Sequence, residues 1–224
     1  MSNFLAPAPF DFVGIFKSII TRWYLYVGLA VVFVLLFIIT ALVKKPKVNN
    51  LSKTQNLVYM AIFSALCMVA NIVQIPTPFI QASLVATMAF MSGILFGGAK
   101  GFIVAFLGDL IGGIIAPQGV YSPIIGVGTG MLGLIPGVVF YNVRLNDLLK
   151  IIISFALTFI VSSVLLNTVG VCLIYSPSAL MIRLGELPIA LVVHVLNCLL
   201  SIGIYQLLKK VLPKDKFLFI ESEK

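Results

Sequence analysis

Residues 23–43 read WYLYVGLAVVFVLLFIITALV, an apolar run without a charged residue. A helix needs about 20 such residues to cross the ~30 Å hydrocarbon core of a bilayer, because it rises about 1.5 Å per residue. The run is longer than the apolar core of a signal peptide, and lysines follow it instead of a small-residue cleavage site. We therefore predict a transmembrane helix that stays in the protein.

Six further apolar runs follow this helix and indicate the fold class. They are Gln55–Val73, Ala82–Phe96, Gly101–Ile115, Ile124–Tyr141, Leu149–Tyr175 and Pro188–Leu208. The 224 residues are 61% hydrophobic and 10% charged, whereas a soluble domain is about 45–50% apolar and about 25% charged. We predict an all-α integral membrane protein. The runs Ala82–Phe96 and Gly101–Ile115 are short, and we expect them to be tilted, kinked or partly re-entrant.

The runs divide the chain into segments. We expect an interfacial amino-terminal segment (1–20), an extra transmembrane helix (21–43) and a basic cytoplasmic linker (44–53, KKPKVNNLSK). A six-helix membrane domain (54–212) and a charged cytoplasmic tail (213–224) complete the chain.

The positive charges predict the orientation. If the linker lysines are cytoplasmic, twelve Lys and Arg residues lie inside, against Lys17, Arg22 and Arg183 outside. The amino terminus is then outside and the carboxyl terminus inside. The net charge of +8 comes from residues that flank apolar runs, so we expect a lipid bilayer and no nucleic acid as the partner of these charges.

In this topology three connections face outward and carry Pro or Gly turns with aromatic, amide and charged groups. They are Gln74–Gln81, Ala116–Pro123 and Ser176–Leu187. They are either plain helix connectors or the cover of a ligand pocket, and we favour the pocket. Stacking on tyrosine, amide hydrogen bonds and an arginine facing an anionic group would bind the ligand. The candidate substrate contacts are Gln74, Gln118, Tyr121, Asn167, Tyr175, Arg183 and His194.

Polar residues inside apolar spans need partners, because an unpaired one costs free energy in lipid. For Asp109 we favour a structural role at a glycine-lined crossing over a ligand or ion contact. His194 is a ligand contact or a packing residue, and Asn167 is a ligand contact or a link between helices. Arg183 either meets an anionic ligand group or pairs with Glu186 three residues on.

Several chemistries are not indicated. The chain has no P-loop, no nucleophile or zinc-protease motif and one histidine, so we expect no enzyme and place an intramembrane enzyme third among the hypotheses. Its three cysteines, Cys67, Cys172 and Cys198, lie in apolar runs, so we expect neither a disulfide framework nor a metal site. We also expect no cofactor in this chain. If the chain transports a solute, it uses a gradient or takes energy from another subunit.

Four motifs together resemble a known family. They are the small-residue pattern Ala61–Ala65, the run GDLIGG at 108–113, PQGVYSP at 117–123, and Leu166-Asn167-Thr168 followed by Tyr175 and Arg183. In this combination, from Ser52 to Lys210, the chain resembles the substrate-binding S components of energy-coupling factor (ECF) vitamin transporters, most of all the folate-transporter branch. Two features depart from the family pattern: the extra helix, and Val169-Gly170 where folate-type members tend to carry an aromatic residue.

The resemblance implies a function. An S component in a bacterial cell membrane binds a vitamin, here folate or a related small solute, from outside. It then docks on a transmembrane coupling (T) subunit and two ATPase subunits, which use the ATP, and topples to release the solute inside. Ala61 and Ala65 match the docking motif for the T subunit. The alternative is a proton-coupled secondary transporter of a small solute that uses Asp109, Glu186 or His194.

Overall fold

The computed structural model describes residues 53–73, 75–76, 81–116, 122–174 and 179–211. The predicted interfacial segment 1–20, the extra helix 21–43, most of the linker 44–53 and the tail 213–224 lie outside these residues. Those segments stay predictions, as do the orientation of the chain and its division into domains.

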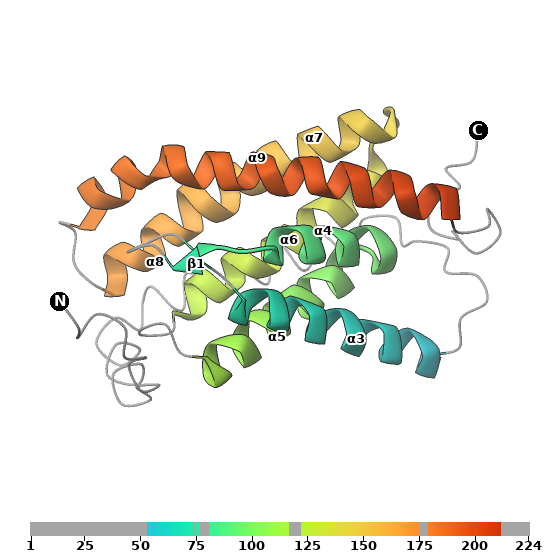
Figure 1. Ribbon diagram of the computed structural model, residues 1–224, viewed down its shortest axis with the longest axis horizontal. Helices are drawn as coiled ribbons and strands as arrows, with labels where there is room; N and C mark the ends of the chain where they lie inside the picture. Colours follow the sequence, from blue (N-terminus) through green and yellow to red (C-terminus); the bar gives the residue numbers. More distant parts are fainter. Residues whose placement is uncertain (1–52, 74, 77–80, 117–121, 175–178, 212–224) are drawn as a thin grey trace.

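Helices make up nearly all of the described chain (Figure 1). The first four are α3 (Lys53–Ile72), α4 (Val85–Phe96), α5 (Gly98–Ile115) and α6 (Pro123–Asn142). The next membrane segment consists of α7 (Asp147–Thr158), a π-helix η1 (Phe159–Leu166) and α8 (Asn167–Ile174), and α9 (Ala179–Val211) is the last. Two short strands, β1 (Ile75–Pro76) and β2 (Gln81–Ala82), pair antiparallel between α3 and α4, with Ile75 opposite Ala82.

This architecture confirms the predicted all-α membrane class. Five helical segments of the described chain are long and apolar enough to cross a membrane, and the 12-residue α4 is shorter, as expected for the run Ala82–Phe96. The expectation that the run Gly101–Ile115 is short was wrong, because α5 begins at Gly98 and its 18 residues are enough to cross. The prediction for the last span was wrong at its start. Helix α9 begins at Ala179 and not at Pro188, so most of the expected outer loop Ser176–Leu187 is helix. Residues 179–187 contain good helix formers, and a helix in a membrane tolerates Pro188 because neighbouring groups satisfy the freed carbonyl.

Glycines allow α4, α5 and α6 to pack at backbone distance. A Cβ on Gly101 would lie 2.5 Å from Gly93 Cα of α4 and 2.8 Å from Gly133 O of α6. The connection between α4 and α5 is Gly97, whose φ of 86° lies in the left-handed region that favours glycine. These three helices therefore form the closely packed centre of the domain.

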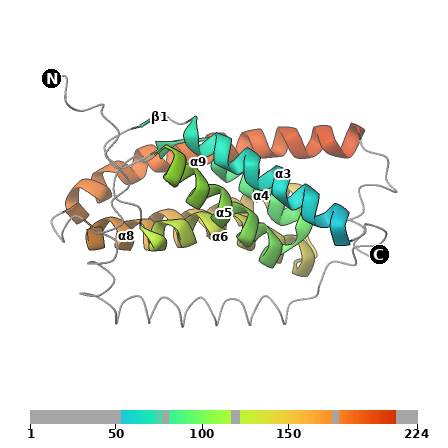
Figure 2. The same cartoon turned by 90° about the horizontal axis from the view of Figure 1, so that it is seen from below.

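Aromatic and aliphatic side chains join α9 and α7 to this centre. Phe90 of α4 packs on Phe140 of α6 and Phe155 of α7, and Phe140 packs on Tyr205 of α9. In Figure 1, α9 runs along one side of the molecule and α3 along the opposite side, and Figure 2 shows β1, the end of α8 and the start of α9 at one end of the bundle. Helices α3 and α9 expose many large apolar side chains, as lipid-facing helices do.

Candidate functional site

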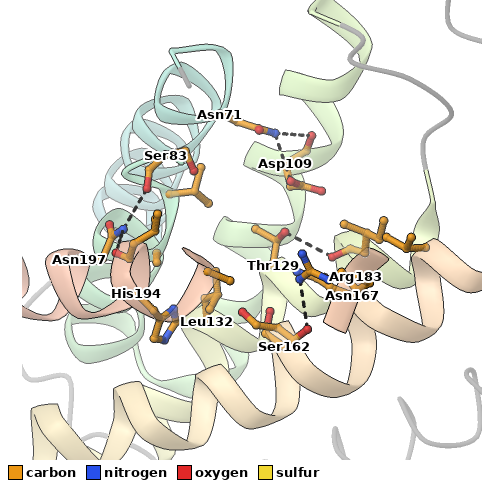
Figure 3. A pocket seen from close by; sticks show the side chains of 17 residues that line it. Asn71, Ser83, Asp109, Thr129, Leu132, Ser162, Asn167, Arg183, His194 and Asn197 are labelled. Atoms are coloured by element: carbon orange, nitrogen blue, oxygen red, sulfur yellow. Dashed lines mark hydrogen bonds between the residues drawn. The ribbon is translucent and has the colours of Figure 1, made fainter. Parts of the chain in front are cut away.

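A polar cavity of about 200 Å³ lies inside the bundle, between α9 and the helices that face it (Figure 3). Ten of its 17 lining residues are polar, an unusual proportion in a chain that is 61% hydrophobic. No Phe, Tyr or Trp lines it among the described residues. The polar members are Asn71, Ser83, Asp109, Thr129, Ser162, Ser163, Asn167, Arg183, His194 and Asn197. Polar groups gathered at one place in an apolar bundle indicate a binding site for a hydrogen-bonding solute.

The π-helix η1 supplies one wall of this cavity. The backbone N–H of Asn167 donates to Ser162 O, five residues back, as a π-helix requires. The next carbonyl, Ser163 O, accepts from the Thr168 hydroxyl at 3.4 Å and from Arg183 Nη2 at 3.3 Å. The backbone irregularity thus provides an acceptor for a cation from α9, and π-helical turns occur frequently at functional sites.

Asn167 directly follows the π-helix and lies against α6. A Cβ on Gly128 would lie 2.8 Å from Asn167 Oδ1, so the glycine leaves room for this amide. The Oδ1 atom is buried and has no hydrogen-bond partner in the described part of the chain. A buried acceptor without a donor costs about 1–3 kcal/mol. A donor on a bound solute would remove this cost.

Arg183 lies in the second turn of α9 and is 3% exposed. Its Nη1 is 3.9 Å from Glu186 Oε2, so the pairing that the sequence left open does form. Because its Nη2 also donates to Ser163 O, the guanidinium is held between α9 and the π-helix while it lines the cavity. The planar fork of an arginine suits carboxylate or phosphate groups, although Glu186 competes for it here.

His194 lies deeper along α9, between the rings of Phe155 and Phe159. Its Nε2 is 3.0 Å from Phe155 O and 3.1 Å from Thr158 Oγ1. A carbonyl oxygen can only accept, so we assign the proton of the neutral ring to Nε2, which leaves Nδ1 as an acceptor. The histidine is therefore both a packing residue and a lining residue of the cavity.

Asn197, one turn further along α9, was missing from the sequence-based candidates. Its Oδ1 accepts from Thr87 Oγ1 of α4 at 2.7 Å, and its Nδ2 donates to Ser83 O at 3.1 Å and to Val193 O at 3.0 Å. A lone amide inside an apolar span was the available signal, but the sequence does not say which helix it faces.

Asp109 of α5 faces Asn71 of α3 across the upper part of the cavity in Figure 3. Asn71 Nδ2 donates to Asp109 Oδ1 at 3.1 Å and to Asp109 O at 3.2 Å. Asp109 thus links two helices at a glycine-lined crossing, the geometry that its predicted structural role requires, while it also lines the cavity.

The structure brings three of the predicted contacts, Asn167, Arg183 and His194, to this one cavity. The other four lie outside the described residues, and their role stays a prediction: Gln74, Gln118, Tyr121 and Tyr175. Among the described residues, no cluster of His, Cys, Asp or Glu could hold a metal ion.

The two alanines of the predicted docking motif lie on the outside of the bundle. Ala61 and Ala65 are both exposed on α3, and Leu57, Ile62 and Leu66 around them are exposed too. Small residues on an outer helix face allow close approach of another helix.

Comparisons with known proteins give one family match and two matches of fold. The family model of the ECF-type riboflavin transporter S component matches residues 50–210. A solved structure of FolT bound with folic acid has a TM-score of 0.57 and 19% identity, covering 73% of this chain and 96% of that chain. A second, of the S component of a bacterial ECF transporter, has a TM-score of 0.57 and 20% identity, covering 71% and 98%. No curated protein matches the chain.

Proposed function

The chain belongs to the family of ECF-type riboflavin transporter S components, and we propose that it captures a vitamin from outside the cell for uptake. S components are transporter subunits and not enzymes. The observation that carries the proposal is the polar cavity inside an apolar bundle. In a membrane domain such a cavity is costly unless a polar solute uses it.

Riboflavin is the first solute to test. The family match covers residues 50–210 and bears the name of riboflavin, whereas the likeness to FolT, at 19% identity, concerns the fold. Riboflavin is an uncharged molecule with a hydroxyl-rich chain and a ring that carries N–H and carbonyl groups. Amide and hydroxyl side chains such as Asn167, Ser162 and Thr129 suit these groups.

Folate, the solute that the sequence motifs favoured, would need a cationic partner in the site. Its glutamate carboxylates are anionic and would need Arg183 as their partner. Because Arg183 already lies near Glu186 and Ser163 O, folate would have to compete with these groups. The cavity therefore favours an uncharged solute, with folate second.

Uptake would need the partners that the family resemblance implies. In our proposal the exposed Ala61 and Ala65 face of α3 docks on a T subunit, and two ATPase subunits supply the energy from ATP. The chain itself then needs no cofactor.

Equilibrium dialysis of riboflavin against the detergent-purified chain tests the capture role. We expect saturable binding by the wild type and at least tenfold weaker binding by Asn167→Ala, because that variant lacks the open acceptor. Asn142→Ala is the matched control: its exposed amide donates to Val138 O within α6, far along the helix from the cavity. Equal affinity of both variants would contradict the assignment of the cavity.

Uptake by membrane vesicles separates capture from the proton-coupled alternative. If the chain captures solute for an ATP-driven module, vesicles that contain the chain alone accumulate no riboflavin, with or without a proton gradient. Accumulation by the chain alone that an uncoupler abolishes would overturn the proposal.

A further inference from the structure

We propose that Asn197 is a positioning residue for solute binding, which holds the α4 wall of the cavity against the α9 wall and makes no decisive bond to the solute. The inference rests on the proposed function, because it concerns the same cavity. It assigns to Asn197 a role different from that of the other amide, Asn167.

Two walls of the cavity meet at Asn197. The start of α4 contributes Val85 and Ala86, with Ser83 just before it, and α9 contributes Val193 and His194 on the other side. In the part of the chain that the structure describes, each side-chain hydrogen bond between these two walls involves the Asn197 amide or the Asn197 backbone carbonyl. At the cavity, Asn197 therefore supplies the side-chain hydrogen bonds that join α4 to α9 in the described residues.

The Asn197 amide has its hydrogen-bonding capacity nearly filled by protein groups. Both N–H groups of Nδ2 are accounted for by Ser83 O and Val193 O, and Oδ1 accepts from Thr87 Oγ1 at 2.7 Å. An amide has two donors and one acceptor oxygen, so one lone pair is left for a solute. Asn167 differs, because its Oδ1 is buried without a partner in the described residues. The Asn197 amide joins two helices, whereas the Asn167 amide has an acceptor that a ligand can use.

Apolar packing continues the same contact further along the two helices. Ile202 of α9 packs on the cluster that contains Ala86, Phe90 and Tyr205. Ala86 of this cluster lines the cavity, but Ile202 itself does not. Ile202→Ala is therefore a control variant, which weakens the contact between α4 and α9 at a residue that does not line the cavity.

The first experiment needs no ligand. Hydrogen–deuterium exchange is measured for the amides at the start of α4, from Met88 onward, in wild type and in Asn197→Leu at equal fractions of folded protein. We expect at least tenfold faster exchange in the variant, because Ser83 and Thr87 lose their partner on α9. Unchanged exchange in this turn would overturn the inference, whether or not the chain binds a vitamin.

The second experiment measures the rate at which riboflavin dissociates. We expect about tenfold faster dissociation from Asn197→Leu, because the α4 wall loses the two side-chain hydrogen bonds that the Asn197 amide makes to Thr87 and Ser83. Thr87→Val should be faster too, and the double variant should be less impaired than the product of the single effects, because the two side chains act on each other. Ile202→Ala should lower the melting temperature with a dissociation rate within about twofold of wild type.

The outcomes separate positioning from general stability. If Ile202→Ala speeds dissociation as much as Asn197→Leu at a similar loss of stability, Asn197 is a merely structural residue and the inference is wrong. If riboflavin does not bind the wild type, it is the proposed solute that fails, and the exchange at the start of α4 still decides the role of Asn197.

Discussion

The close packing of α4, α5 and α6 makes a sharp prediction for Gly101→Ala. The added Cβ would lie 2.5 Å from Gly93 Cα and 2.8 Å from Gly133 O. Carbon atoms pack at about 3.5–4.0 Å, so α5 would have to move away from α4 by roughly 1 Å. These neighbours are backbone atoms, which cannot rotate aside as a side chain does.

The size of the effect follows from two opposing terms. Overpacking of a tight site costs about 1–3 kcal/mol, and the rigid backbone on both sides places Gly101→Ala at the upper end, about 3 kcal/mol. Alanine is the better helix former by about 1 kcal/mol, which offsets part of this cost. The net loss of about 2 kcal/mol corresponds to a melting temperature lower by roughly 4–8 °C in a chain of this size.

Thermal unfolding in detergent measures this loss against a matched control. Gly203 lies exposed on α9, and a Cβ there would meet no heavy atom within 4 Å. Gly203→Ala should therefore keep or raise the melting temperature. Since α5 and α6 carry Asp109, Thr129 and Leu132 to the cavity, Gly101→Ala should also weaken riboflavin binding. A Gly101→Ala protein as stable as Gly203→Ala would refute the backbone-contact argument.

Two further predictions concern the charges of the cavity and the outer face of α3. Arg183→Gln removes the cation beside Glu186 and should lower the melting temperature, since breaking a buried ion pair costs about 3–5 kcal/mol. The double variant Arg183→Gln with Glu186→Gln should recover part of this loss. If it recovers none, the two side chains are not coupled. Ala61→Trp should leave the affinity for riboflavin unchanged. It should reduce co-purification with the T and ATPase subunits at least tenfold, because a large side chain blocks close helix approach. Undiminished co-purification would place the docking face elsewhere.

The membrane spans could be predicted because lipid acts on composition over many residues. A run such as 124–141 has few alternatives to a helix, and the structure places α6 at Pro123–Asn142. The start of α9 could not be predicted in the same way. Pro188 suggested a helix start, but its missing N–H frees a single carbonyl, and the helix formers before it continue the α-helix to Ala179.

Three asparagines show how much of the site could be predicted from the sequence. Asn71, Asn167 and Asn197 each interrupt an apolar run and each need a partner. The sequence favoured Asn167 alone, through the motif in which it occurs. The structure shows that Asn71 and Asn197 are committed to neighbouring helices, a distinction that depends on distant residues such as Asp109 and Thr87.

The π-helix explains why no periodicity argument could have assembled this cavity. A π-turn adds one residue to an α-helical turn, which rotates all that follows by roughly 100° relative to a uniform helix. Asn167 follows directly after η1, so its face cannot be counted from Asp147 by a period of 3.6. The same irregularity leaves Ser163 O to accept from Arg183 of α9. The placement of an amide and a cation in one polar site thus depends on a backbone feature that the sequence FIVSSVLL at 159–166 does not reveal.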